Sequence, residues 1–140
     1  MNIDKYKNQH VAILKCIEDL RDLVKLGIAE HAAEIAKRVI DMSSIIKLHL
    51  STEDKMLYPA LEKIDDRALN SLGKQYQHQM THIAAAYGEF AKKWNNAGNV
   101  SQHPEDFRKD ANHVLKILYE RIQKENQDFY PKIESAPFIS

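Results

Sequence analysis

The sequence repeats part of itself after 72 positions, and the repeated residues are of kinds that bind metal ions. The aligned pairs are His10 with His82, Glu53 with Glu125, and Tyr58-Pro59 with Tyr130-Pro131. One position breaks the pattern, because His49 aligns with Arg121. Two similar helix pairs that pack face to face would bring the histidines and carboxylates to one interior point. Helical bundles build two-metal sites in this way.

Length and composition predict one all-α domain. The chain has 140 residues, which is enough to bury a core without disulfides or structural metals. Charged residues make up 29% of it, and only four glycines and four prolines are present, which favours long helices over a turn-rich sheet protein. We expect a single domain over residues 1–134 and a tail over residues 135–140.

The charge balance argues against a nucleic-acid or membrane partner. Lysine and arginine together number 20, as do aspartate and glutamate, and the pI of about 7.1 predicts no basic surface for nucleic acid or anionic lipid. The N-terminus is polar, and no stretch approaches the roughly 18 apolar residues of a membrane-spanning helix. The single cysteine, Cys16, excludes an internal disulfide and fits a reducing compartment. We therefore expect a cytoplasmic protein.

Apolar residues recur at steps of three and four in four segments, which predicts an up-down-up-down four-helix bundle with an internal two-fold pseudo-repeat. The expected stripes cover residues 3–24, 35–56, 69–94 and 107–128, with loops near Gly27, at 64–66 and at 95–99. The second and fourth helices are expected to end at Pro59 and Pro131, because the residue before a proline is disfavoured in helical geometry.

Polar residues lie in or beside these apolar stripes, although burying an unpaired charge costs several kcal/mol. Residues four apart share one face of a helix, so such a pair can act as a clamp. The pairs are His49 with Glu53, His78 with His82, and Arg121 with Glu125. Imidazole suits iron, zinc, copper or nickel, and a carboxylate can bridge two ions. A lone histidine such as His10 is more often a core residue, but that alternative does not predict the repeated register.

These residues resemble the hemerythrin-like (HHE cation-binding) domains, which are four-helix bundles that hold a non-haem di-iron centre. The family pattern is a lone histidine on the first helix, HxxxE followed by an aromatic-proline pair on the second, one or two histidines on the third, and HxxxE or HxxxxD on the fourth. The matching residues are His10, then His49 and Glu53 before Tyr58-Pro59, then His78 and His82, then Glu125 before Tyr130-Pro131. The resemblance spans nearly the whole chain.

The resemblance implies a cofactor of two iron ions, bridged by carboxylates and an oxygen species. The implied ligands are Glu53 and Glu125 as bridges, His10 and His49 on one iron, and His78 and His82 on the other. The ligands come from all four helices, so the centre would lie inside the bundle.

Arg121 departs from the family pattern, because a guanidinium cannot bind a metal ion. Three alternatives remain open. In the first, His78 supplies the missing imidazole, and Arg121 hydrogen-bonds a carboxylate or a bound oxygen species without touching the metal. In the second, the iron on the His82 side is weakened, which leaves a mononuclear or easily demetallated centre. In the third, Arg121 pairs with Glu53 or Glu125 in a bundle without metal.

The resemblance implies a protein that binds dioxygen or a related diatomic or peroxide ligand, for oxygen binding, storage or sensing, or for iron handling. The alternatives are a degenerate metal-free or mono-iron bundle that acts through protein contacts, and a di-iron protein of the nitric-oxide or oxidative-stress response. A further alternative is an enzyme with a peroxidase-like or oxidase activity at the di-iron centre, which would need substrate access that no motif here specifies. The sequence does not indicate a protein partner.

Overall fold

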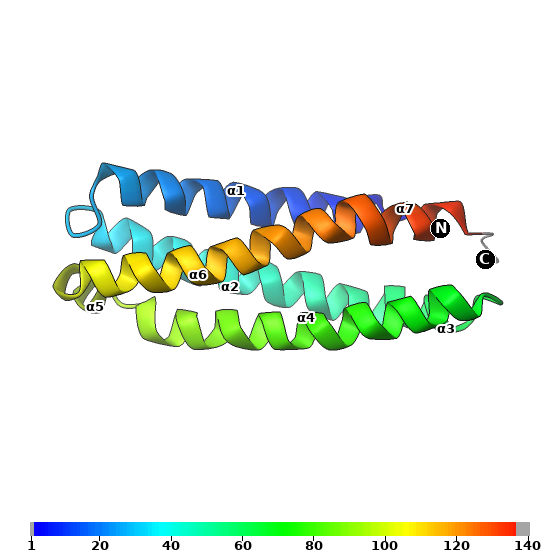
Figure 1. Ribbon diagram of the computed structural model, residues 1–140. Helices are drawn as coiled ribbons and strands as arrows, with labels where there is room; N and C mark the ends of the chain where they lie inside the picture. Colours follow the sequence, from blue (N-terminus) through cyan, green and yellow to red (C-terminus); the bar gives the residue numbers. More distant parts are fainter. Residues whose placement is uncertain (1, 137–140) are drawn as a thin grey trace.

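The computed structural model describes residues 2–136, which form helices joined by short turns (Figure 1). The long helices of this part are α1 (Asp4–Leu26), α2 (Ala32–Thr52), α4 (Arg67–Trp94) and α6 (Pro104–Lys124). The short helices are α3 (Tyr58–Glu62), which continues α2, α7 (Tyr130–Ser135), which continues α6, and α5 (Ala97–Gln102), which lies between α4 and α6. No helix within residues 2–136 is long and apolar enough to cross a membrane.

The four long helices form a bundle in which each helix contacts its two neighbours in the cycle α1, α2, α4, α6. Figure 1 shows these helices side by side along one axis, with α5 at one end and α3 and α7 at the other. Consecutive long helices run in opposite directions, because the chain reverses at an end of the bundle between each of them and the next. The predicted all-α four-helix bundle is therefore confirmed.

Local sequence signals set several helix ends. Helix α1 stops at Gly27, whose φ of 129° is rarely adopted by residues with a side chain. Helix α4 begins after Asp66, whose carboxylate accepts a hydrogen bond from the Leu69 N–H at 3.0 Å. Pro104 lies in the first turn of α6, where its missing N–H is not needed. The predicted positions of these ends agree with the structure.

The second and fourth helices do not end at their prolines, and the prediction was wrong on this point. Two π-helical turns, η1 (Glu53–Leu57) and η2 (Glu125–Phe129), precede the prolines, and α3 and α7 continue beyond them. In each turn the tyrosine before the proline donates its N–H to the carbonyl five residues back. A proline ring in an α-helix clashes with the carbonyl four residues before it, and the wider π turn relieves that contact.

The π turns also change which side chains point inward. Met56, expected in the second apolar stripe, is 53% exposed, and Asp128, expected in the fourth, is only partly buried. Leu57 and Phe129 are fully buried instead. The extra residue in each π turn accounts for both differences, because it rotates the residues that follow about the helix axis.

Two other expectations concern segments outside the long helices. Residues 95–99 were expected to form a loop, but α5 begins there, with the side chain of Asn96 accepting a hydrogen bond from the Asn99 N–H at 3.2 Å. The prediction underestimated the capping ability of asparagine in this stretch. In the expected tail, 135–140, Ser135 ends α7, while residues 137–140 lie outside the described part of the chain.

Two hydrophobic clusters fill the bundle, and a polar layer separates them along its axis. The larger cluster occupies the α5 end and includes Trp94 and Phe107, and the smaller one surrounds α3 and α7. In α1, for example, His10 falls between Tyr6 of the smaller cluster and Ile13 of the larger. Because buried charge costs stability unless it is paired, this layer is the first place to look for function.

Candidate metal centre

The polar layer consists of five buried side chains, each at most 4% exposed. They are His10 from α1, His49 from α2, Glu53 at the start of η1, Arg121 from α6, and Glu125 at the start of η2. The two pairs separated by four residues each lie on one helix face, as predicted from their spacing. The structure thus brings together four of the six predicted ligands and Arg121.

The ligand atoms of this layer lie close together. Those of His10, His49 and Glu125 are all within 4.8 Å of one another. The Nε2 atoms of His10 and His49 are 3.2 Å apart, and His10 Nε2 is 3.0 Å from Oε1 of Glu125. Oε1 of Glu53 is 3.1 Å from His49 Nε2. Two imidazoles and two carboxylates therefore converge on one small volume.

Hydrogen bonds on the outer side of each imidazole fix the position of its proton. His10 Nδ1 donates to Oδ1 of Asn126, and His49 Nδ1 donates to Oε1 of Gln9, both at 2.7 Å. Thr52 orients the Gln9 amide, because its hydroxyl hydrogen goes to a backbone carbonyl of α2 and its oxygen accepts from Gln9 Nε2. With Nδ1 protonated, Nε2 of each neutral imidazole carries a lone pair directed into the cluster.

The inward-facing atoms are short of proton donors. Oε1 of Glu53 and both carboxylate oxygens of Glu125 are buried without a hydrogen bond. An unsatisfied buried polar group costs about 1–3 kcal/mol, and a charged one costs more. A cation among these atoms would remove the cost, because it interacts favourably with every lone pair that points inward. The residues therefore fit a metal ion that accepts imidazole and carboxylate ligands.

The hydroxyl of Tyr130 completes the inner surface of the cluster. It donates to Oε2 of Glu53 at 2.9 Å and lies 3.1 Å from Nε2 of His10, and the tyrosine ring stacks on the His10 ring with centres 4.9 Å apart. Burial raises the pKa of Tyr130, and the negative charges of Glu53 and Glu125 raise it further. The hydroxyl therefore keeps its proton and acts as a donor to the carboxylate.

Proton equilibria in the cluster also respond to the carboxylates. Burial alone would lower the pKa of His10, but the adjacent carboxylate of Glu125, together with Asn126 and Glu53, raises it above the usual value. A proton and a metal ion at Nε2 of His10 would therefore be favoured by the same negative charges.

Arg121 is a fixed positive charge beside Glu125. Its Nη2 donates to the backbone carbonyl of Tyr76 at 2.5 Å, and its Nη1 donates to Oε1 of Gln79 at 3.1 Å. The guanidinium carbon is 4.4 Å from the centre of the Tyr76 ring. Its Nε is 3.5 Å from Oε2 of Glu125 without forming a hydrogen bond. The guanidinium supplies charge but no metal ligand.

The structure does not bring His78 and His82 to the cluster. Both side chains are exposed on the outer face of α4, where their ring centres are 4.8 Å apart. The inward face of α4 at this level carries Tyr76 and Met80, which are 1% and 2% exposed. This arrangement differs from the expected ligand set, because no imidazole of α4 faces the two carboxylates.

The difference arises because α1 and α4 repeat at an offset of 70 positions, whereas α2 and α6 repeat at 72. The buried positions of α1 and α4 that correspond at this offset are Tyr6 with Tyr76, His10 with Met80, Ile17 with Tyr87, and Leu20 with Phe90. Two residues correspond to about 200° of rotation around a helix. His82 lies two residues beyond Met80, the position that corresponds to His10, and is therefore on the outward face of α4.

Hydrogen bonds confirm the offset of 70. Gln9 accepts from the ring of His49, and Gln79, which is 70 positions later, accepts from the guanidinium of Arg121. Each glutamine thus binds the side chain that occupies the same position in the facing helix. The two halves of the bundle share one arrangement, with different residues at two inward positions.

Four residues of the site were not predicted from the sequence: Gln9, Gln79, Asn126 and Tyr130. A signal for the glutamines is present, because the pattern YxxQH at 6–10 recurs as YxxQM at 76–80. Tyr130 belongs to the repeated Tyr-Pro pair, which was read only as a helix end. For Asn126 the sequence offers no comparable signal.

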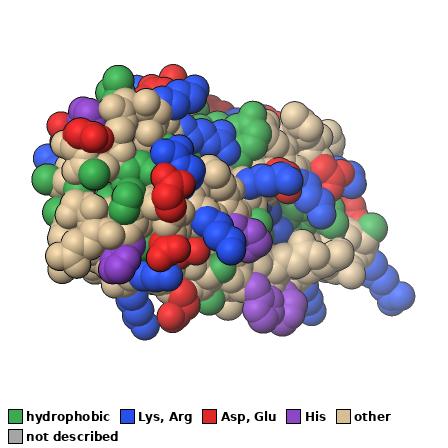
Figure 2. All heavy atoms as spheres, turned by 60° about the vertical axis from the view of Figure 1, so that its left-hand side comes forward, with side chains coloured by type: hydrophobic (Ala, Val, Ile, Leu, Met, Phe, Trp, Pro, Cys, Tyr) green, Lys and Arg blue, Asp and Glu red, His purple; other side chains and the backbone are tan. Residues whose placement is uncertain are grey.

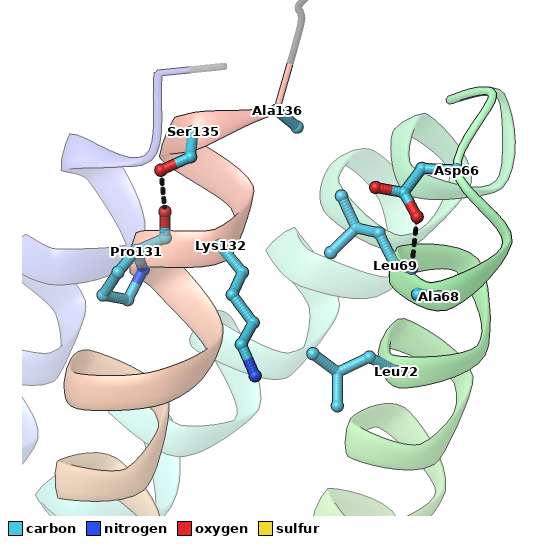
Figure 3. Close-up of a pocket in the computed structure, with 8 residues that line it drawn as sticks. All are labelled: Asp66, Ala68, Leu69, Leu72, Pro131, Lys132, Ser135 and Ala136. Atoms are coloured by element: carbon cyan, nitrogen blue, oxygen red, sulfur yellow. Dashed lines mark hydrogen bonds between the residues drawn. The ribbon is translucent and has the colours of Figure 1, made fainter.

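The surface of the described residues presents other features but no comparable ligand set. Figure 2 shows acidic and basic side chains interspersed over one face. A groove of about 630 Å³ lies between the start of α4 and α7 (Figure 3). Its charged side chains already have partners, since Asp66 caps α4 and Lys132 pairs with Asp128 at 2.8 Å. Within residues 2–136, His10, His49 and Glu125 are the group whose ligand atoms are close enough to hold an ion.

Comparison with known proteins identifies the family of this chain. A family model described as the hemerythrin HHE cation binding domain matches residues 1–133. The comparisons with curated proteins and with solved structures gave no match. The matched range contains all four long helices and the whole polar layer. The chain therefore belongs to the hemerythrin HHE cation-binding domain family.

Proposed function

We propose that this protein binds one transition-metal ion, with iron as the first candidate, through His10, His49, Glu53 and Glu125. The observation that carries the proposal is the convergence of two imidazole Nε2 atoms and unpaired carboxylate oxygens in a buried space. Imidazole and carboxylate together suit iron, and also zinc, manganese or copper, so the metal is identified by experiment. The bound ion would supply a Lewis-acidic and, for iron, redox-active centre inside the bundle.

The ligands present favour one ion over the two expected from the resemblance. A second ion bridged by Glu53 and Glu125 would need further ligands from α4 and α6. The inward positions there are occupied by Met80 and Arg121, and the two histidines of α4 are on its exposed face. Of the three alternatives that Arg121 leaves open, the mononuclear centre is thus the one that the side-chain positions support best.

The role that we propose for the centre is to bind dioxygen or a related diatomic or peroxide ligand. The four proposed ligands are at most 1% exposed, so only a molecule of a few atoms can approach the ion without moving a helix. The hydroxyl oxygen of Tyr130, whose proton goes to Glu53, would lie beside such a ligand at the inner surface of the cluster. An enclosed site of this kind favours carriage, storage or sensing over turnover of a larger substrate.

The metal content of the full-length protein tests the first step of this proposal. Protein purified from iron-supplemented cells, or reconstituted anaerobically with Fe²⁺, should contain one ion per chain by elemental analysis. Co²⁺ should bind with the same stoichiometry and give visible absorption bands that report imidazole and carboxylate ligands. Glu53→Ala and His49→Ala should lose the ion, because each removes an inward ligand. His82→Ala is the matched control and should retain it.

Other outcomes have distinct meanings. Two ions per chain, lost in His82→Ala, would replace the mononuclear centre by the two-iron centre that the family resemblance implies. A folded protein that takes up none of Fe²⁺, Co²⁺, Zn²⁺ or Mn²⁺ would overturn metal binding and leave a bundle that acts through protein contacts. If one ion binds, the ferrous protein should then change its spectrum on exposure to dioxygen, nitric oxide or hydrogen peroxide; no response to any of them would refute the small-ligand role.

A further inference from the structure

We infer that the guanidinium of Arg121 takes the place of a second metal ion, and that Met80 takes the place of its histidine ligand. The half of the bundle that contains His10 and His49 then binds a metal ion, and in the other half the side chain of Arg121 supplies the positive charge. This inference rests on the proposed single-metal centre and explains why the chain binds one ion instead of two. It also defines which changes would restore a second ion.

The first support is the repetition of contacts between the two halves. The ring of His49 donates to Oε1 of Gln9 at 2.7 Å, and the guanidinium of Arg121 donates to Oε1 of Gln79 at 3.1 Å. These pairs are related by the offsets of 72 and 70 that relate the buried faces of the helices. Arg121 therefore has the same neighbour in the α4–α6 half of the bundle that the His49 imidazole has in the α1–α2 half.

The second support is the position of Met80. It is 2% exposed and lies 70 positions after His10, on the inward face of α4. Asn126, which accepts from His10 Nδ1, has Asp54 as its counterpart 72 positions earlier, and Asp54 already accepts a hydrogen bond from Gln77 of α4. An imidazole at position 80 would thus have an outer carboxylate in the place where His10 has an amide oxygen.

The third support is the charge of the layer. Glu53 and Glu125 are both fully buried, and Arg121 is the one lysine or arginine among the buried residues of the described chain. Its Nε is 3.5 Å from Glu125 Oε2, and its other nitrogens are held by Tyr76 and Gln79. A guanidinium keeps its charge at any physiological pH and cannot bind a metal. It therefore offsets part of the carboxylate charge while repelling a second cation.

Metal stoichiometry in a set of full-length variants tests the inference. Anaerobic titration with Co²⁺ and Fe²⁺ should give one ion for the wild type, for Arg121→His and for Met80→His. The single variants should stay at one because the first lacks the α4 ligand and the second keeps the guanidinium. The double variant Met80→His/Arg121→His should bind two ions per chain. Met80→Leu/Arg121→His is the control for altered packing and should bind one.

Removing the positive charge gives a second test that does not depend on building a new site. Arg121→Gln keeps hydrogen-bonding groups near Gln79 but removes a cation close to the metal. The affinity for the single ion should therefore rise by about tenfold or more, because a neighbouring positive charge opposes cation binding. If Arg121 acted only by holding Glu125 in place, the same variant would bind the ion more weakly.

The outcomes separate the two proposals. A wild type with one ion and a folded double variant that still binds one ion, or an Arg121→Gln variant with weakened binding, would overturn the inference while leaving the metal centre intact. A wild type that binds no ion would overturn the proposed function and this inference with it. A wild type that binds two ions would show that Arg121 does not replace a metal.

Discussion

The Nε2 atoms of His10 and His49 face each other at 3.2 Å, and both rings have their Nδ1 protons committed to outer hydrogen bonds. Two neutral imidazoles in this arrangement cannot hydrogen-bond each other, because neither has an Nε2 proton. Either a proton is added to one ring or a cation lies between them. The negative charges of Glu53 and Glu125 favour the added proton and the cation alike. In the proposed centre, the binding of a metal ion would therefore be linked to the release of a proton.

Metal loading should stabilise the fold, because the unfolded chain does not hold the four ligands together. At a free metal concentration about 100 times the Kd, the free energy of unfolding should increase by about 2.7 kcal/mol. Urea denaturation of chelator-treated and metal-loaded protein, followed by far-ultraviolet circular dichroism, measures the difference. Glu53→Ala should show no metal-dependent shift. An equal shift in this variant would mean that the stabilising ion binds elsewhere.

The two tyrosines of the Tyr-Pro pairs should differ in their effect on metal affinity. Tyr130 donates to Glu53 at 2.9 Å, whereas the buried hydroxyl of Tyr58 makes no hydrogen bond. Tyr130→Phe should weaken metal binding by about 10–100-fold, because it leaves a ligand carboxylate without its donor. Tyr58→Phe should leave the affinity within about twofold of the wild type, since no bond is lost. Competition with a chromophoric chelator measures both values, and equal losses would contradict the assignment.

Much of the fold was predictable from the sequence, because apolar periodicity reports directly on the buried face of a helix. The positions from Ile3 to Leu20 and from Ile35 to Glu53 are buried at the expected steps. The signals at Gly27, Asp66 and Pro104 mark helix ends in the structure. Each of these features depends on local sequence alone.

The π turns were not predictable in this way. A proline after an apolar stripe usually indicates the end of a helix, and only contacts made by α3 and α7 with the rest of the bundle favour continuation. Leu61 and Ile133, at 1% and 0% exposed, supply those contacts in the smaller hydrophobic cluster. Tertiary packing is therefore the reason that the helices continue beyond Pro59 and Pro131.

The prediction of two ligands from α4 applied one offset to the whole chain, and the structure places both histidines away from the cluster. The apolar stripe through Tyr76 and Tyr87 fixes the inward face of α4, and a residue at position 78 or 82 falls on the opposite side. The offset of 72 between His10 and His82 coincides with the offset of the other helix pair but not with the facing of α4. The apolar stripe of α4 indicates that Met80, rather than either histidine, occupies the inward position.

Substitutions of two glycines should change stability in opposite directions. Gly27 has a φ of 129°, and an added Cβ would collide with the side chain of Glu30. Gly27→Ala should lower the free energy of unfolding by about 1–3 kcal/mol. Gly88 lies within α4, and a Cβ there would meet no atom within 4 Å. Gly88→Ala should raise stability by roughly 0.5–1 kcal/mol, because alanine loses less entropy in a helix. Urea denaturation measures both, and a gain for Gly27→Ala would contradict the strain.

Stability at low pH should depend on Asp110, which joins α6 to α4. It accepts hydrogen bonds from Trp94 Nε1 at 2.9 Å and from Lys93 Nζ at 3.2 Å. Burial alone would raise the pKa of Asp110, but these bonds lower it below its ordinary value of 3.8. A lowered pKa in the folded state means that the ionised group stabilises the fold above pH 3.8, and that this contribution is lost as the pH falls through the folded-state value.

Asp110→Asn should therefore cost about 1 kcal/mol near neutral pH, discounted for the partial exposure of the group. The difference from the wild type should shrink as the pH falls below 3.8. Denaturation of chelator-treated protein across this range measures it without a contribution from metal release. Glu105→Gln, which alters a largely exposed pair with Arg108, is the control and should change stability little at any pH. A difference for Asp110→Asn that persists at low pH would point to packing instead of charge.

The two glutamines that hold corresponding side chains should have unequal effects on metal binding. Gln9 orients His49, a proposed ligand, whereas Gln79 orients Arg121, which cannot bind the ion. Gln9→Ala should weaken metal affinity by about 10–100-fold, because the imidazole loses the acceptor that fixes its proton and its orientation. Gln79→Ala should leave metal affinity nearly unchanged and lower stability instead, since a buried guanidinium loses a partner. Chelator competition and urea denaturation of both variants separate these effects. Equal losses of affinity would mean that both halves of the bundle bind metal, and the assignment of one ion to the His10 and His49 side would then be wrong.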